Sequence, residues 1–246
     1  MLLSDYLGFI GALFVCMIIS FWASSKVRSA YAKYGRVYNR AGITGYDTAV
    51  LLLRANGIRG ISIDRISGTL SDHYNPSKGI VNLSEGVFGN DSVAAVAIAA
   101  HEIGHVVQKE RGYLFYKIRT ALVPVVNIGS SLAMPLVIIG ILIDCFVVTS
   151  ANTSAGFNFA MVGVILYASS LAFTLITLPV ELNASRRAKQ MLLEQGILTN
   201  EEIKGANAVL SAAALTYLAS LLTSAVYFLR FLLYVLAIFG RRNNRR

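Results

Sequence analysis

The sequence predicts a mainly α-helical, polytopic membrane protein that carries one small α+β insert. Of its 246 residues, 55% are hydrophobic and only 14% are charged, and the mean hydropathy is +0.60. Soluble domains usually have about a quarter charged residues, so the missing charge indicates segments that lie in lipid. The composition therefore excludes a disordered chain and disfavours a soluble globular protein.

The charge is strongly basic and unevenly distributed. The chain has 22 Lys and Arg against 13 Asp and Glu, which gives a net charge of +9. Between Thr120 and Val180 the one charged residue is Asp144, so the basic excess lies in loops beside apolar stretches. Basic cytoplasmic flanks are typical of membrane proteins, and we therefore expect a lipid bilayer and no nucleic acid as partner. Cys16 and Cys145 lie in apolar runs, which indicates neither a disulfide framework nor a thiolate metal site.

Residues 1–23 are predicted to form the first transmembrane segment. Tyr6–Ala23 is apolar apart from Ser20 and is long enough to cross most of the hydrocarbon layer. Asp5 precedes this run and basic residues follow it, which is the reverse of a signal peptide. We expect a retained anchor whose N-terminus lies outside the cell.

Residues 24–120 form the predicted insert, with 13 basic and 7 acidic residues and mixed periodicity. Tyr46–Asn56 is predicted to be a short helix that ends at Gly57. Alternating polar residues around Ile61–Ile66 indicate a strand, and Ile80–Leu83 a second one. Because so small a core needs more apolar cover, we expect the insert to fold together with residues 181–205.

Residues 121–180 are predicted to form a transmembrane helical hairpin. Ala121–Val148 and Phe157–Val180 are the two apolar stretches, and the link Thr149–Gly156 carries no charge. An uncharged link suits the non-cytoplasmic side, so both ends of the hairpin return inside.

Residues 206–246 contain an apolar helical region, a last membrane segment and a basic tail. As one helix, Ala206–Phe239 would be roughly 50 Å long, too long for one span and short for two. One solution is a buried helix from Ala206 to about Leu222 that leads into a membrane segment around Arg230.

The chemistry of the insert lies on a predicted helix over Ser92–Arg111, capped by Asn90 and Asp91. It carries the run His101-Glu102-Ile103-Gly104-His105. The four-residue spacing places both imidazoles on one helix face, where they can bind one Zn²⁺, and Glu102 can act as general base toward a water at the metal. A shuffled chain of this composition would contain the pattern with a probability on the order of one in a thousand. The ordinary alternative is two structural histidines.

A catalytic zinc site needs a third protein ligand and an open position. No histidine follows His105, so we expect a carboxylate. Asp144 lies within or beyond the hairpin, whereas Glu181 returns to the side of the histidine helix. Its competitors lie among polar residues typical of a hydrated surface: Glu194, Glu201 and Glu202. We therefore predict one Zn²⁺ per chain on His101, His105 and Glu181.

Over nearly its whole length the sequence resembles the YugP-type neutral zinc metallopeptidases, a family of bacterial membrane proteins. The resemblance rests on five segments: Asp72–Pro76, Val81–Ser84, Ala99–His105, Pro179–Ser185 and Ala213–Tyr217. The sequence is also distantly similar to the HtpX-like and CAAX-prenyl membrane proteases. In those proteins the ligand Glu is followed by Ala at the third place and Asp at the fourth. Here Ser185 replaces that Asp, so we expect Asn183 or Ser185 to bond a ligand histidine more weakly.

The resemblance implies a zincin-like (gluzincin) catalytic insert that acts on polypeptides. The resembling proteases pair an extended substrate with an edge strand, which Val81–Ser84 would supply here; the alternative is a plain core strand. We expect His73 or Tyr74 to donate a hydrogen bond to the oxyanion, with Tyr113 and Arg186 as less favoured donors.

The predicted function is a zinc-dependent membrane metalloendopeptidase that hydrolyses peptide bonds of membrane or membrane-adjacent polypeptides. It would be a multi-pass protein of the bacterial plasma membrane whose site faces the cytoplasm. The alternative is a catalytically silent zinc-fold scaffold that binds a partner membrane protein, but such a module needs no general base at Glu102. A transporter is disfavoured because Asp144 and Arg230 are too few charges for a pathway. The sequence leaves the oligomeric state open.

Overall fold

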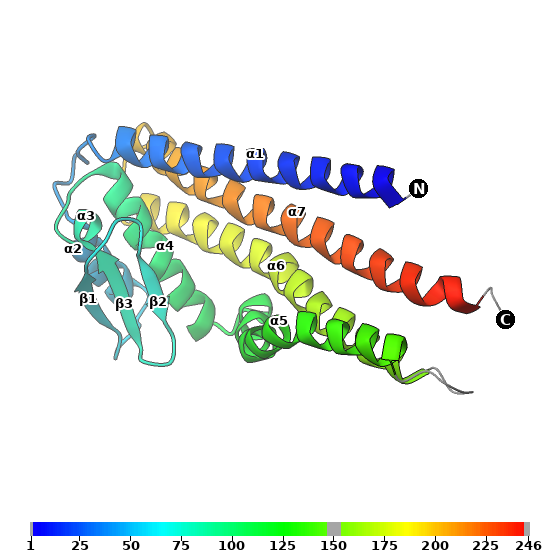
Figure 1. Ribbon diagram of the computed structural model, residues 1–246. Coiled ribbons are helices and arrows are strands. Elements are labelled where there is room, and N and C mark those ends of the chain that lie inside the picture. The colour runs from blue at the N-terminus through cyan, green and yellow to red at the C-terminus, as the bar shows by residue number, and fades with distance from the viewer. Residues whose placement is uncertain (1, 147–153, 244–246) are drawn as a thin grey trace. The chain divides into compact units, whose positions relative to one another are not determined.

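The computed structural model describes residues 2–146 and 154–243 (Figure 1). The described chain contains these elements in order: α1 (Leu2–Tyr34), α2 (Gly45–Ala55), β1 (Ser62–Ile66), β2 (His73–Asn75), β3 (Ile80–Ser84), α3 (Glu85–Phe88), α4 (Val93–Glu110), α5 (Leu114–Phe146), α6 (Ser154–Glu194) and α7 (Glu202–Asn243). Most of the expected link Thr149–Gly156 lies outside the described residues.

Within the described residues, four helices are long and apolar enough to cross a membrane. The candidate spans are Leu7–Tyr34 of α1, Leu114–Ile143 of α5, Ala155–Glu194 of α6 and Glu202–Ala237 of α7. Together with the small three-stranded sheet, they confirm the predicted class of a mainly helical polytopic membrane protein with a small α+β insert.

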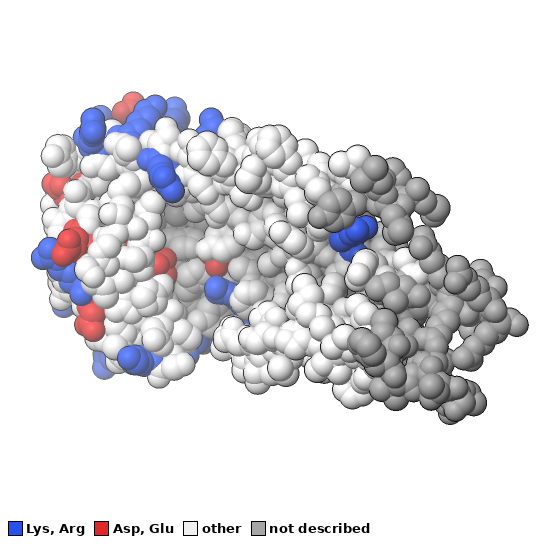
Figure 2. Space-filling model, viewed as in Figure 1, with Lys and Arg blue, Asp and Glu red and all other residues white. Residues whose placement is uncertain are grey.

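The chain divides into two compact units. The first consists of Met1–Ile19, Ile118–Thr177 and Leu218–Arg246, and the second of Ser20–Lys117 and Leu178–Tyr217. Figure 2 shows charged side chains concentrated on the second unit, whereas apolar and neutral residues dominate the visible surface of the first. This contrast is expected where one unit meets lipid and the other meets water.

Helices of the first unit pack through small residues. A Cβ on Gly163 would lie 2.6 Å from the Ala133 carbonyl oxygen, so α5 and α6 approach too closely for a larger side chain there. Val137, Val164 and Val235 fill the core around this contact. Close backbone approach through small residues is the usual way in which membrane helices associate.

Two long helices differ from the expected segmentation. α6 continues through Pro179 to Glu194, so Glu181 lies within it, near the end of the apolar stretch. α7 is a single helix of 42 residues, so the region left open from Ala206 onward passes Leu222 without a break. Since its sequence has neither proline nor a capping signal between Glu202 and Asn243, nothing in it ends the helix.

The sheet of the second unit has the strand order β1-β3-β2. β1 and β3 match the two predicted strands, and they pair in parallel, with Ile63 opposite Val81. β2, which the sequence did not predict, pairs antiparallel with β3. The three residues of β2 are too few for an alternating pattern to be recognised in the sequence.

β3 lies between β1 and β2. Val81–Ser84 therefore lies in the central strand, and the expectation that it is an edge strand is wrong.

α4 is enclosed by the rest of the second unit. Nearly every residue from Val93 to Gln108 is buried, which is the burial expected of a helix that is apolar on all sides. Its N-cap is Ser92, whose hydroxyl accepts the Ala95 N–H at 3.2 Å, and not Asn90 or Asp91 as expected. The Asn90 side chain instead accepts the Ser92 N–H at 2.8 Å.

Candidate metal centre

The centre lies where α4 crosses the C-terminal part of α6. Gly104, between the two histidines, allows this crossing: a Cβ there would lie 2.7 Å from the Ala184 carbonyl oxygen. Because both backbones nearly touch at Gly104 and Ala184, side chains close to this point on the two helices share one space. These residues are His101, His105 and Glu181.

The three side chains form a compact donor set. Glu181 Oε2 lies 3.2 Å from His101 Nε2 and 3.4 Å from His105 Nε2, and the carboxylate is buried. Ligands of a tetrahedral zinc with bonds of 2.0–2.1 Å lie about 3.3–3.4 Å apart. Two imidazoles and one carboxylate are also a known catalytic zinc set. The chemistry of these donors and the two separations from Glu181 therefore fit Zn²⁺, and all three donor atoms lie within 4.8 Å of one another.

Each histidine is oriented through its second ring nitrogen. His101 Nδ1 lies 3.1 Å from Ser185 Oγ, and His105 Nδ1 lies 3.0 Å from Gln108 Oε1. The Gln108 amide donates to the Val180 carbonyl at 2.8 Å, so its oxygen must accept from His105. His105 therefore carries its proton on Nδ1 and leaves Nε2 for a metal.

Of the two residues expected to bond a histidine, Asn183 and Ser185, it is Ser185 that contacts His101. Asn183 is linked to His105 through Gln108, because its side-chain oxygen accepts a hydrogen bond from the Gln108 amide at 3.0 Å. Gln108 was not identified from the sequence. Its position three residues after His105 on the same helix was the available signal.

Glu102 is buried beside the donor set, with 7% of its surface exposed. Burial is the main cause that raises the pKa of Glu102 to about 7, and the nearby Glu181 and Asp72 add to it. His101 and the Tyr74 backbone N–H act in the opposite direction. A carboxyl group whose pKa is near neutrality is well suited to accept and return a proton.

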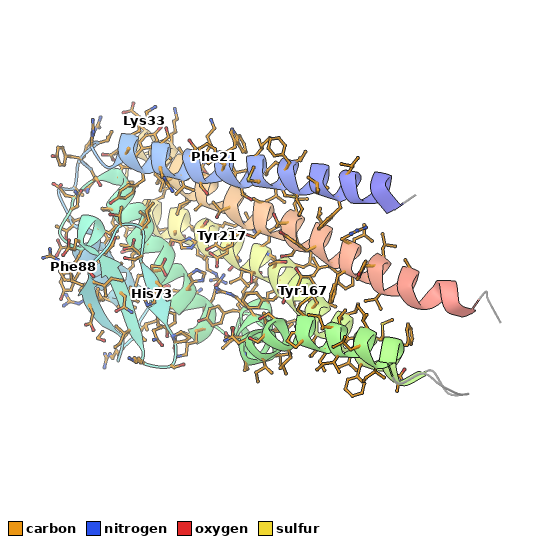
Figure 3. All side chains as sticks on the ribbon, viewed as in Figure 1. Phe21, Lys33, His73, Phe88, Tyr167 and Tyr217 are labelled. Carbon is orange, nitrogen blue, oxygen red and sulfur yellow. The ribbon has the colours of Figure 1, made fainter. Side chains whose placement is uncertain are left out.

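The other predicted side chains have different surroundings. His73 is exposed on β2, where Nδ1 lies 2.9 Å from the Ser71 carbonyl and Nε2 lies 3.1 Å from the Asn82 amide (Figure 3). The Tyr74 hydroxyl accepts from Lys109 Nζ at 3.2 Å. Arg186 is exposed on α6.

The competing carboxylates are engaged elsewhere. Glu194 accepts the Gln190 amide, Glu201 pairs with Arg40 at 3.3 Å, and Glu202 accepts the Thr199 N–H as part of the cap of α7. None of the three belongs to the donor set in the described part of the chain.

Comparison with known proteins agrees with this site. A family model described as "Putative neutral zinc metallopeptidase" matches residues 9–236, and the chain therefore belongs to this family. The protein named "Putative membrane protease YugP" of Bacillus subtilis (strain 168) is 41% identical over 226 residues, which are 92% of this chain and 95% of that protein. No solved structure matches the chain.

Proposed function

We propose that the protein is a zinc-dependent membrane metalloendopeptidase that hydrolyses membrane or membrane-adjacent polypeptides. The observation that carries this proposal is the buried donor set of His101, His105 and Glu181 with the carboxyl of Glu102 beside it. A silent scaffold would not need Glu102, because burying an unused carboxyl is costly. The family descriptions support the same reading.

In the proposed mechanism, the ligands, the general base and the residues that orient the histidines have separate roles. His101, His105 and Glu181 would hold one Zn²⁺, which supplies Lewis acidity to water and to a peptide carbonyl. Glu102 takes the proton of the attacking water and passes it to the leaving amine. Ser185 and Gln108 keep the imidazoles oriented.

His73 and Tyr74 remain the proposed donors to the oxyanion. His73 would have to exchange its contact with Ser71 or Asn82 for the substrate, whereas the Tyr74 hydroxyl accepts from Lys109 and can still donate its own proton. We further propose that the site faces the cytoplasm of the bacterial cell. The basic residues of the second unit support this orientation.

Metal content and proteolysis together test the proposal. The purified full chain should bind one zinc and should lose peptide hydrolysis when a chelator removes it. Glu181→Ala should lose most bound zinc, whereas Glu194→Ala, on the same helix but bonded to Gln190, should keep it. Zinc lost from the Glu194 variant and retained by the Glu181 variant would overturn the ligand assignment.

A further inference from the structure

A cavity of about 340 Å³ opens beside His101 and Glu102, and all residues that line it belong to the second compact unit. Its walls come from α1, from the loop before β2, from α4 and from α7. Tyr217, which Figure 3 labels on α7, is one of the lining residues. The cavity therefore adjoins the proposed reacting groups and is the natural place for a substrate side chain.

The walls of this cavity are mainly apolar. Ile98, Val209 and Leu210 each expose less than a tenth of their surface and face the cavity from α4 and α7. The Thr216 hydroxyl donates to the Ala213 carbonyl at 2.7 Å, so this polar group already has a partner in its own helix. A bound side chain would mostly exchange water for apolar contact.

Besides Glu102, which has the proposed role of general base, the lining contains one more acidic residue, Asp72, that could suggest a basic substrate side chain. Its carboxylate, however, accepts the Ser84 N–H at 2.7 Å and the Ser84 hydroxyl at 3.0 and 2.9 Å. Burial raises the pKa of Asp72, and the hydrogen bonds from Ser84 act in the opposite direction. Asp72 therefore anchors the loop before β2 and offers little to a substrate cation.

Leu70, at the tip of this loop, lines the cavity in an unfavourable backbone conformation. Its φ of 56° is the one positive value among the described residues other than glycine. Leucine rarely adopts this region, and such outliers gather at functional sites. The Ser71 hydroxyl, which donates to the Ser67 carbonyl at 3.1 Å, and the Asp72 anchor hold the loop on either side of the strain. Leu70 nevertheless keeps 38% of its surface exposed, available to a ligand.

We propose that this cavity binds a large apolar side chain next to the scissile bond, and that Leu70 and Ala213 determine its size. The inference rests on the proposed peptidase function and names its substrate class. Two walls belong to α1 and α7, whose candidate spans include the lining residues from Val27 to Tyr31 and from Val209 to Tyr217. A polypeptide that leaves the membrane along these helices brings apolar residues of this kind.

The experiment uses the zinc-loaded full chain in detergent with a mixture of peptides from a digested proteome. Mass spectrometry identifies the cleavage sites, and Glu102→Gln serves as the blank. Leu, Ile, Met or Phe should be enriched at one position beside the cleaved bond. For matched peptides, kcat/KM should be on the order of 10–100-fold higher with Phe than with Ser at that position.

Filling the cavity tests the assignment of its walls. Ala213→Phe should lower the ratio of kcat/KM for the Phe and Ser peptides at least about tenfold. Ser211→Phe is the control, because Ser211 is exposed on the same helix and does not line the cavity. Leu70→Ala should broaden the accepted sizes without affecting zinc content.

The outcomes separate the two proposals. Enrichment of Lys or Arg, absence of any preference, or an unchanged ratio in Ala213→Phe would overturn the cavity assignment while leaving a peptidase. Absence of cleavage by the zinc-loaded parent, or equal cleavage by Glu102→Gln, would overturn the proposed function and this inference with it.

Discussion

Gln108 shows how one buried amide organises the metal centre. It is fully buried, and its three hydrogen bonds join His105 to the Val180 carbonyl and to Asn183 on α6. Because α4 supplies two proposed ligands and α6 the third, this side chain couples the orientation of a histidine to the position of the helix that carries Glu181.

Replacing Gln108 should weaken zinc binding without removing a ligand. Gln108→Leu keeps most of the volume but leaves His105 Nδ1 without its acceptor, and loss of such an outer partner typically lowers metal affinity about 10–100-fold. Competition with a chromophoric chelator measures the change. Gln190→Leu is the control, since its amide bonds Glu194 on an exposed surface. Equal zinc affinity in both variants and the parent would contradict the role given to Gln108.

At the scale of elements, the crossing of α4 and α6 explains why glycine stands between the two histidines. A Cβ at Gly104 would meet the Ala184 carbonyl oxygen at 2.7 Å and its Cα at 3.2 Å. These contacts are backbone, which cannot rotate away, so any larger residue must push the helices apart.

Gly104→Ala should therefore lower both thermal stability and zinc content. Overpacking of this kind costs about 1–3 kcal/mol, which exceeds the gain of about 1 kcal/mol from replacing glycine in a helix. Gly11→Ala in α1 is the matched control, because a Cβ there meets nothing within 4 Å. Thermal unfolding in detergent and metal analysis give the two readouts. A Gly104 variant as stable as the Gly11 variant would show that the crossing tolerates separation.

Sequence reasoning succeeded where a single element carries its own signal. The spacing of His101 and His105 on a capped, proline-free helix predicts their shared face, and the apolar length of the four long helices predicts the class of the protein. It failed where the signal depends on partners. β2 is a strand because β3 lies beside it. The bond between Gln108 and Val180 joins residues 72 positions apart, which no local pattern reveals.

At the scale of the whole molecule, the orientation in the membrane determines which polypeptides reach the site. The 13 basic residues of residues 24–120, against none in Thr149–Gly156, favour a cytoplasmic site. Cysteine labelling measures this in a background with Cys16→Ala and Cys145→Ala. Ser154→Cys should react with an impermeant reagent from outside intact cells, and Ser77→Cys only after permeabilisation. The opposite pattern would place the site outside the cell.

The central claim is that Glu102 acts as a general base beside a zinc ion that it does not bind. Glu102 follows His101 directly, so on a helix it points about 100° away from that ligand, and it lies outside the donor set. Glu102→Gln keeps the shape of the side chain but cannot accept the proton.

The most direct measurement determines zinc content and peptide cleavage on the same preparation of Glu102→Gln. We expect near-stoichiometric zinc and a cleavage rate lower by about 10²–10⁴-fold, the usual loss for a positioned general base. A variant that cleaves as fast as the parent would show that Glu102 is not the base, and zinc lost in step with activity would show that its role is structural.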